Sequence, residues 1–94
     1  MILYRIKMNL LREEIDSIDN HILTLLSKRA QVAISILKEK NKLNKEILCH
    51  EREQTILDRL QEQNNSHLQN PAIVRVFSTI IEECRNLQSD MRRI

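Results

Sequence analysis

Apolar residues in the first forty positions of the chain recur at alternating spacings of four and three residues. The series consists of Leu11, Ile15, Ile18, Ile22, Leu25, Val32 and Ile36. This spacing places the side chains on one stripe of an α-helix, and no Pro or Gly interrupts the stretch. The pattern therefore predicts one very long helix over about residues 5–41, with the polar segment 41–45 at its end.

Two shorter helices are predicted in the rest of the chain, over about residues 47–64 and 70–92. The first of them carries Ile56, Leu57 and Leu60 on one stripe and ends in a polar cluster at residues 64–67. The second is expected to begin with Asn70 as its N-cap and with proline in its first helical position. Its apolar residues also follow the four-three spacing: Ile73, Phe77, Ile80, Cys84, Leu87 and Met91.

The length of the first helix is out of proportion to the size of the chain. At 1.5 Å per residue it measures about 45–60 Å, whereas a compact globule of this size has a radius of gyration of about 12 Å. The chain cannot cover such a helix by itself, so a second copy is expected to complete the fold. The predicted fold class is all-α, with three helices per chain in an intertwined helical-bundle homodimer. Residues 1–94 are expected to form a single domain.

The composition removes several kinds of chemistry. The chain contains no glycine, so phosphate-binding loops of the dinucleotide and Walker types are excluded, and left-handed turns must use Asn. The net charge is +2, from 15 basic and 13 acidic residues that are interspersed along the sequence. This mixture argues against a nucleic-acid partner.

The sequence also lacks a targeting signal and the cysteine spacing of a disulfide framework or a zinc site. The stretch Met1–Ile6 is too short and too charged for a secretory signal, and no apolar run is long enough to cross a bilayer. The chain is therefore expected to be cytoplasmic, with no membrane partner. Cys49 and Cys84 lack CxxC spacing, which favours reduced thiols over a disulfide or a zinc site.

Two basic residues of the first helix stand at positions that the pattern predicts to face inward. Arg29 stands on the apolar stripe between Leu25 and Val32, where a guanidinium needs an anion or several acceptors. Lys40 lies eleven residues further on, which is about 20° around the helix and about 16 Å along it, so the two side chains face the same way. Together they are suited to holding one dianion. Taken singly, Arg29 also fits a register-setting residue, and Lys40 a solvated helix end.

The two shorter helices each place one further polar residue on an apolar stripe. Glu53 shares the stripe of Ile56 and Leu60, so one carboxylate faces inward; a salt bridge to a nearby cation is the alternative. Gln88 follows Cys84 on the stripe of the last helix and presents a neutral donor toward the core. The alternative for Gln88 is a buried amide that another side chain satisfies.

Arg12 is on the same helix as Arg29, but the two residues are separated by about 25 Å along the axis and about 100° around it. They cannot share a small ligand within one chain. They can do so across a dimer in which the partner's first helix runs antiparallel; otherwise Arg12 is an ordinary exposed arginine.

Together, the helices place several cations, one carboxylate and one amide inward, without a metal-ligand set and without a Ser-His-Asp or Cys-His pair. This combination is typical of a pocket for a polyanion that uses no nucleophile.

These residues and their order resemble the all-α chorismate mutases, above all the mutase domain of bifunctional chorismate mutase–prephenate dehydratases. The resemblance covers about residues 9–91. In sequence order it rests on 11–16 (LREEID), 18–19 (ID), 25–30 (LLSKRA), 38–40 (KEK), 52–53 (RE) and 80–88 (IIEECRNLQ).

The resemblance implies a cofactor-free rearrangement of chorismate to prephenate. Arg29 and the Arg12 of a partner chain would bind the two substrate carboxylates, while Lys40 and Gln88 would address the ether oxygen of the breaking bond. The substrate-binding set would be completed by the following residues: Cys49, Arg52, Glu53 and Cys84. Among these, Glu53 would accept a hydrogen bond from the ring hydroxyl of the substrate. The catalytic group would thus consist of Lys40, Gln88, Arg29 and Glu53.

Two departures from the family pattern affect the substrate site. Cys49 stands where some relatives have Asp, and Cys84 where some have Ser, so the affinity for substrate is expected to differ. Because Gln88 is a neutral amide, activity is expected near neutral pH. The rival hypotheses are an isochorismate-pyruvate lyase, which resembles this fold and pocket, and a non-catalytic helical dimerisation module.

Overall fold

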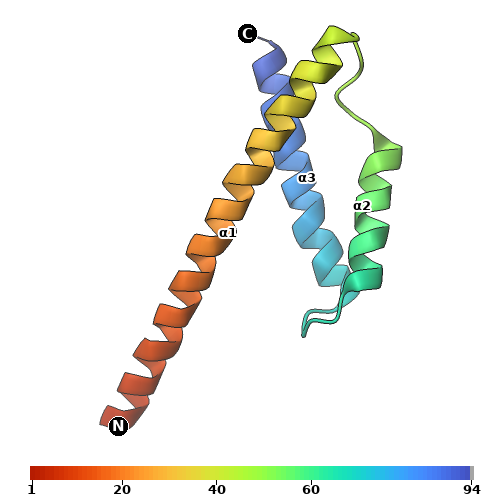
Figure 1. The fold of residues 1–94 in the computed structure, drawn as a ribbon. Coiled ribbons are helices and arrows are strands. Elements are labelled where there is room, and N and C mark those ends of the chain that lie inside the picture. The colour runs from red at the N-terminus through yellow and green to blue at the C-terminus, as the bar shows by residue number, and fades with distance from the viewer. Residues whose placement is uncertain (94) are drawn as a thin grey trace.

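The computed structural model describes residues 1–93, which form three helices and no strand. They are α1 (Ile2–Lys42), α2 (His50–Gln63) and α3 (Asn70–Arg92), connected as Figure 1 shows. The predicted all-α class with one very long helix is confirmed. Two helix starts differ from the prediction: α1 begins at Ile2 rather than at residue 5, and α2 begins at His50 rather than at residue 47.

The late start of α2 follows from the way in which α1 ends. Asn44 takes a left-handed conformation with φ 52°, as expected for a chain without glycine, and the N–H of Lys45 donates to the carbonyl of Lys40 at 2.9 Å. The chain then runs without regular secondary structure to Cys49, whose own backbone is extended, with a φ of −134°. The carbonyl of Ile47 accepts a hydrogen bond from the ammonium of Lys40 at 2.7 Å. A helix that began at residue 47 would turn this carbonyl toward its own N–H groups instead.

The start of α3 differs by one residue from the predicted capping. Gln69, not Asn70, occupies the N-cap position, and its carbonyl accepts the N–H groups of Ala72 and Ile73 at 3.0 and 3.2 Å. The side-chain oxygen of Asn70 instead accepts the amide of Asn64 at 2.8 Å. The assignment of Asn70 as the N-cap was therefore wrong, because a partner across the turn engages its side chain. The proline does lie in the first turn of the helix, as expected.

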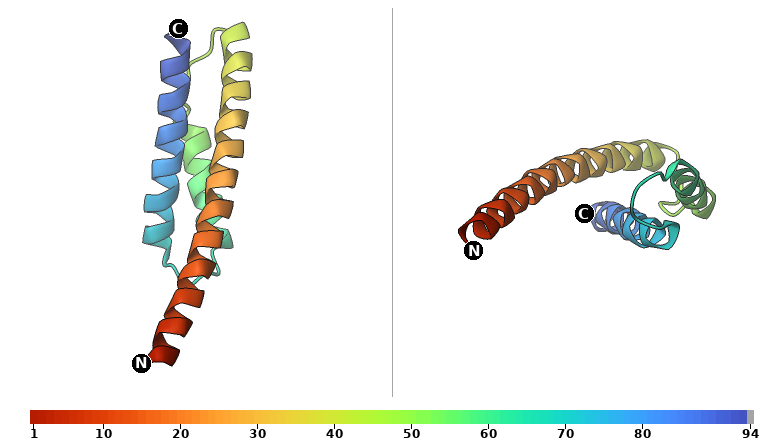
Figure 2. Two further views of the ribbon diagram at one scale, coloured as in Figure 1. Left: turned by 90° about the vertical axis from the view of Figure 1, so that its left-hand side faces the viewer. Right: turned by 90° about the horizontal axis from the view of Figure 1, so that it is seen from below.

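The chain is elongated, with extents of 62 × 30 × 15 Å. Its radius of gyration is 17.8 Å, whereas a compact chain of this length would have about 12 Å. Helix α3 packs beside the C-terminal half of α1 and also against α2, and the N-terminal half of α1 projects beyond both (Figures 1 and 2). The core therefore lies at one end of the molecule.

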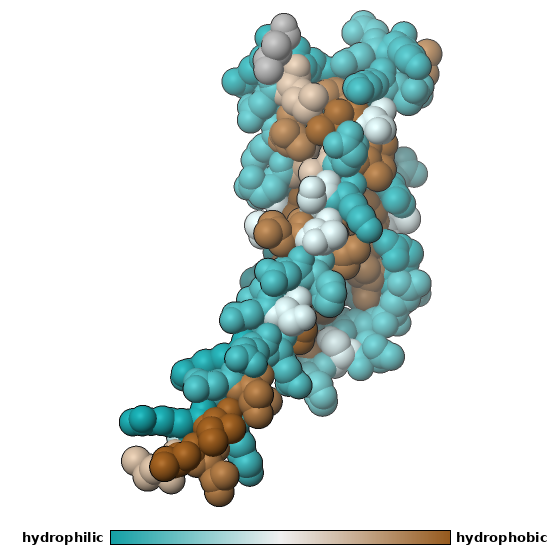
Figure 3. Space-filling view, turned by 60° about the vertical axis from the view of Figure 1, so that its left-hand side comes forward, coloured by the Kyte–Doolittle hydropathy of each residue, from teal (hydrophilic) through white to brown (hydrophobic). Residues whose placement is uncertain are grey.

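The projecting half of α1 exposes its apolar stripe. The five stripe residues from Leu11 to Leu25 are between 48% and 62% exposed. Figure 3 shows apolar side chains gathered at the tip of this projection. In contrast, Ala33, Leu37, Ile81 and Gln88 are buried where α1 meets α3. Half of the longest helix thus presents an apolar face that the described part of the chain leaves uncovered.

The best-buried side chain tests the location of this core. Leu37 is 2% exposed, and Leu37→Ala is expected to lower the free energy of unfolding by about 2–4 kcal/mol, through lost burial and an unfilled cavity. Urea unfolding at a fixed protein concentration measures this loss. Leu68, 54% exposed in the turn before α3, is the matched control, for which alanine costs about 0.5 kcal/mol or less. Equal losses in the two variants would contradict this core.

Candidate active site

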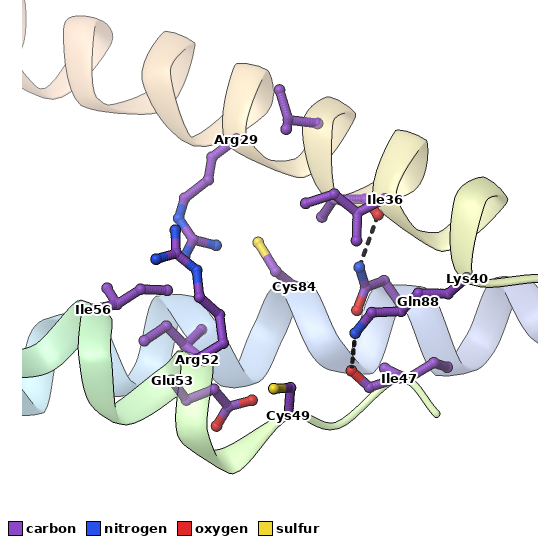
Figure 4. A pocket seen from close by; sticks show the side chains of 13 residues that line it. Arg29, Ile36, Lys40, Ile47, Cys49, Arg52, Glu53, Ile56, Cys84 and Gln88 are labelled. Atoms are coloured by element: carbon purple, nitrogen blue, oxygen red, sulfur yellow. Dashed lines mark hydrogen bonds between the residues drawn. The ribbon is translucent and has the colours of Figure 1, made fainter. Parts of the chain in front are cut away.

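A pocket of about 280 Å³ lies where the C-terminal half of α1, the first turns of α2 and the C-terminal half of α3 converge. This volume is just below the range of about 300–1,000 Å³ that is usual for small-molecule sites. Figure 4 shows the pocket from close by. It is lined by Arg29, Val32, Ala33, Ile36, Lys40, Ile47, Cys49, Arg52, Glu53, Ile56, Ile81, Cys84 and Gln88.

The structure brings together every predicted site residue except one. The residues that line the pocket include Arg29, Lys40, Cys49, Arg52, Glu53, Cys84 and Gln88. Arg12 is exposed on the projecting half of α1 and does not line the pocket. The seventeen residues between Arg12 and Arg29 correspond to about 25 Å of helix, which explains the separation.

Two guanidinium groups enter the pocket from opposite sides. Arg29 extends from α1 and Arg52 from α2, and the two side chains point toward one another (Figure 4). Neither forms a salt bridge within residues 1–93. Since like charges repel and guanidinium groups bind carboxylates through paired hydrogen bonds, the arrangement favours an anion between them.

Lys40 supplies a third cation, which a backbone carbonyl holds in place. Its ammonium donates to the carbonyl of Ile47 at 2.7 Å, and the side chain is half-buried. An ammonium has three donors, so Lys40 can make this bond and still donate to a ligand. The carbonyl therefore orients the ammonium toward the pocket (Figure 4) and leaves N–H donors free for a ligand.

Gln88 is the buried polar residue of α3, with 7% of its surface exposed. Its amide nitrogen donates to the carbonyl of Ala33 on α1 at 2.7 Å. The inward orientation agrees with the prediction, although the satisfying partner is a backbone carbonyl rather than another side chain. A primary amide carries two N–H donors, which leaves one for a ligand. Lys40 and Gln88 thus form a pair of donors whose orientation is fixed by backbone carbonyls.

Glu53 is held by an ion pair with Arg85, a partner that the sequence did not single out. A single nitrogen of Arg85, Nη1, lies 2.8 Å from each of the two carboxylate oxygens. The salt bridge that stood as the alternative for Glu53 is therefore present, and its carboxylate still lines the pocket. Arg85 follows Cys84 directly and precedes Gln88 by three positions. That position on an inward face was the available signal, but it does not identify a partner on another helix.

The remaining walls of the pocket are apolar or weakly polar. Cys49 precedes α2 and Cys84 lies within α3, and both thiols are free. The apolar lining was not identified from the sequence as part of a site. Four of its residues follow the ordinary helical stripe: Val32, Ile36, Ile56 and Ile81. The fifth, Ile47, lies in the segment before α2. Such walls exclude water and thereby strengthen the interaction of the polar groups with a charged ligand.

Neither a metal-binding cluster nor a membrane-spanning helix is found within residues 1–93. In that range, no three His, Cys, Asp or Glu side chains are grouped in a way that would hold a metal ion. Over the same range, no helix combines the length and the apolar character that crossing a membrane requires.

The fold and the pocket define a class of protein, an all-helical chain with a cation-rich small-molecule site. Comparison with known proteins gives the family. A model of the chorismate mutase type II family matches residues 11–89, which is most of the chain. The chain therefore belongs to the chorismate mutase type II family.

Individual relatives agree with this assignment. The chorismate mutase of Methanocaldococcus jannaschii is 35% identical over 79 residues, which cover 83% of this chain and 80% of that protein. The crystal structure of the Helicobacter pylori chorismate mutase in complex with prephenate matches with a TM-score of 0.85 and 31% identity, over 92% of this chain and 93% of that one. The bifunctional chorismate mutase/prephenate dehydratase of Aquifex aeolicus is 35% identical over 86 residues. This chain spans 24% of that protein's length, and the match covers 87% of this chain.

Proposed function

We propose that the protein is a chorismate mutase that rearranges chorismate to prephenate in the pocket between its three helices. The observation that carries the proposal is the meeting of Arg29, Arg52 and Lys40 in one pocket where neither arginine has an acidic partner within residues 1–93. Such a site is electrostatically incomplete until a polyanion enters it. The Helicobacter pylori relative was solved with prephenate, which supports the same class of ligand here.

The proposed roles follow the geometry of the pocket. Arg29 binds a substrate carboxylate and Arg52 completes the cationic wall, while Lys40 and Gln88 donate to the ether oxygen as negative charge grows on it. Because both donors are already oriented by backbone carbonyls at 2.7 Å, little reorganisation is needed when the bond breaks. The carboxylate of Glu53 accepts a hydrogen bond from the ring hydroxyl of the substrate. Holding the substrate in its compact diaxial form supplies the remaining part of the rate enhancement.

The second carboxylate requires a partner chain. We propose a homodimer in which the exposed stripes of two α1 helices pack antiparallel, so that Arg12 of each chain enters the pocket of the other. The stripe residues from Leu11 to Leu25, about half exposed, provide the apolar surface for this contact. In this proposal the helical chain forms one domain and acts in the cytoplasm.

The direct test is the loss of chorismate absorbance with purified protein at neutral pH, with the products identified. Prephenate as the product is expected. Pyruvate released from isochorismate, with no turnover of chorismate, would instead favour the isochorismate-pyruvate lyase. A folded dimer that acts on neither substrate would reject both enzymes and leave a dimerisation module.

The neutral amide at position 88 leads to a prediction on pH. Gln88→Glu is expected to lower kcat/KM at neutral pH by about 10²-fold or more, because an ionised carboxylate would face the oxygen on which negative charge develops. Activity should recover as the pH falls, because only the protonated carboxyl donates a hydrogen bond. The measurement is a pH profile of kcat/KM.

The matched control for this experiment is Gln63→Glu, which adds the same charge at the exposed end of α2, outside the pocket. Its profile should follow that of the wild type. A Gln88→Glu profile with the wild-type shape would mean that position 88 does not donate to the reacting oxygen.

A further inference from the structure

The ion pair between Arg85 and Glu53 joins two helices beside the pocket. Nη1 of Arg85 on α3 lies 2.8 Å from both carboxylate oxygens of Glu53 on α2. The Arg85 and Glu53 side chains are 31% and 24% exposed, respectively. The other salt bridge within residues 1–93 joins Glu39 and Lys42 on α1, and both of those side chains are about 70% exposed. The Arg85 pair is therefore the one that is shielded and that crosses between helices.

The position of this pair creates an electrostatic requirement. Glu53 lines a pocket whose other charged groups are Arg29, Lys40 and Arg52. An uncompensated carboxylate there would repel a dianionic ligand, and the repulsion is strong where burial reduces solvent screening. Arg85 is not among the residues that line the pocket, so it can neutralise the charge of Glu53 without taking up space that the ligand needs.

The geometry of the pair also controls which groups Glu53 can engage. A single nitrogen bridges the two oxygens, so each oxygen keeps a lone pair for a hydroxyl donor. Without Arg85, the guanidiniums of Arg29 and Arg52 would compete for the carboxylate, because they line the same pocket. Either pairing would remove a cation from substrate binding.

We propose that Arg85 is a positioning residue, which neutralises Glu53 and holds it away from the pocket arginines, and so keeps both arginines available for the dianionic substrate. This inference rests on the proposed function. It predicts that the loss of Arg85 acts through Glu53 and appears mainly as weaker substrate binding rather than as slower chemistry.

The test is a double-mutant cycle that combines Arg85→Met with Glu53→Gln, with kcat and KM measured separately for each protein. Arg85→Met alone is expected to raise KM about tenfold and to change kcat by less than about threefold. In the Glu53→Gln background the same substitution should change KM by less than about twofold, since no carboxylate charge remains to compensate. The KM of Arg85→Lys should stay close to the wild-type value, because lysine keeps the positive charge.

Two comparisons separate this role from a purely structural one. Arg75→Met removes an exposed arginine from the same helix and should leave kcat and KM unchanged. An Arg85→Met effect of the same size in both backgrounds would overturn the proposal and leave Arg85 as a packing residue. If Arg85→Met alone fails to fold, Arg85→Lys and the double variant still report on the charge.

The wild type distinguishes the two levels of inference. Prephenate from the wild type, together with equal effects in the two backgrounds, rejects the role of Arg85 and leaves the mutase activity standing. A wild type that forms no prephenate overturns both the proposed function and the role of Arg85.

Discussion

Lys40→Ala is expected to lower kcat/KM for chorismate by about 10²–10³-fold, most of it in kcat. The carbonyl of Ile47 fixes the ammonium of Lys40 at 2.7 Å, so in the proposed role the ammonium would donate to the ether oxygen without a reorganisation cost. Alanine removes the charge from a pocket whose apolar walls would otherwise strengthen its effect. Steady-state kinetics on the purified protein, with folding checked by circular dichroism, measures the loss.

Lys38→Ala is the matched control, since Lys38 lies on the same helix, is exposed and does not line the pocket. It should retain wild-type kinetics. Equal losses in the two variants would mean that Lys40 acts only through the overall charge of α1, which would contradict its proposed role as a donor.

Mixing Arg12→Ala with Arg29→Ala subunits is expected to restore activity that neither variant has alone. Each single variant should lose about 10²-fold or more, because in the proposed dimer one of the two substrate carboxylates then loses its cationic partner. After joint unfolding and refolding, half of the dimers are mixed, and each mixed dimer has one site with both arginines intact. About a quarter of all sites should therefore regain activity.

The control is each variant taken separately through the same unfolding and refolding, which should remain inactive. Recovery toward a quarter of the wild-type rate would demonstrate that Arg12 acts across the interface. A mixed sample no more active than its components, although subunit exchange is verified, would refute the sharing of the site.

The helices and the facing directions along each helix were predictable because they depend on local periodicity. Position along a helix determines the direction of a side chain, so the shared orientation of Arg29 and Lys40 could be worked out from their spacing. The same arithmetic explained why Arg12 does not line the pocket of its own chain. The one-residue error at the start of α3 arose because the side chain of Asn70 bonds to Asn64 across the turn.

The contacts that orient the site could not be predicted in this way. Glu53 and Arg85 lie 32 positions apart, and Gln88 reaches the carbonyl of Ala33 over 55 positions. Such pairs depend on how the helices pack against one another, which the periodicity of a single helix does not encode. The path of the segment before α2 likewise decides that the Ile47 carbonyl meets Lys40.

The sequence by itself determined the helical class, the uncovered stripe of α1 and the inward placement of Arg29, Lys40, Glu53 and Gln88, because helical periodicity is a local property of the chain. Only the tertiary structure decided that these groups from three helices share one pocket, and which backbone carbonyls and which arginine hold them. The physical reason is that distances between helices arise from packing and from loop paths, which involve residues far apart in the sequence.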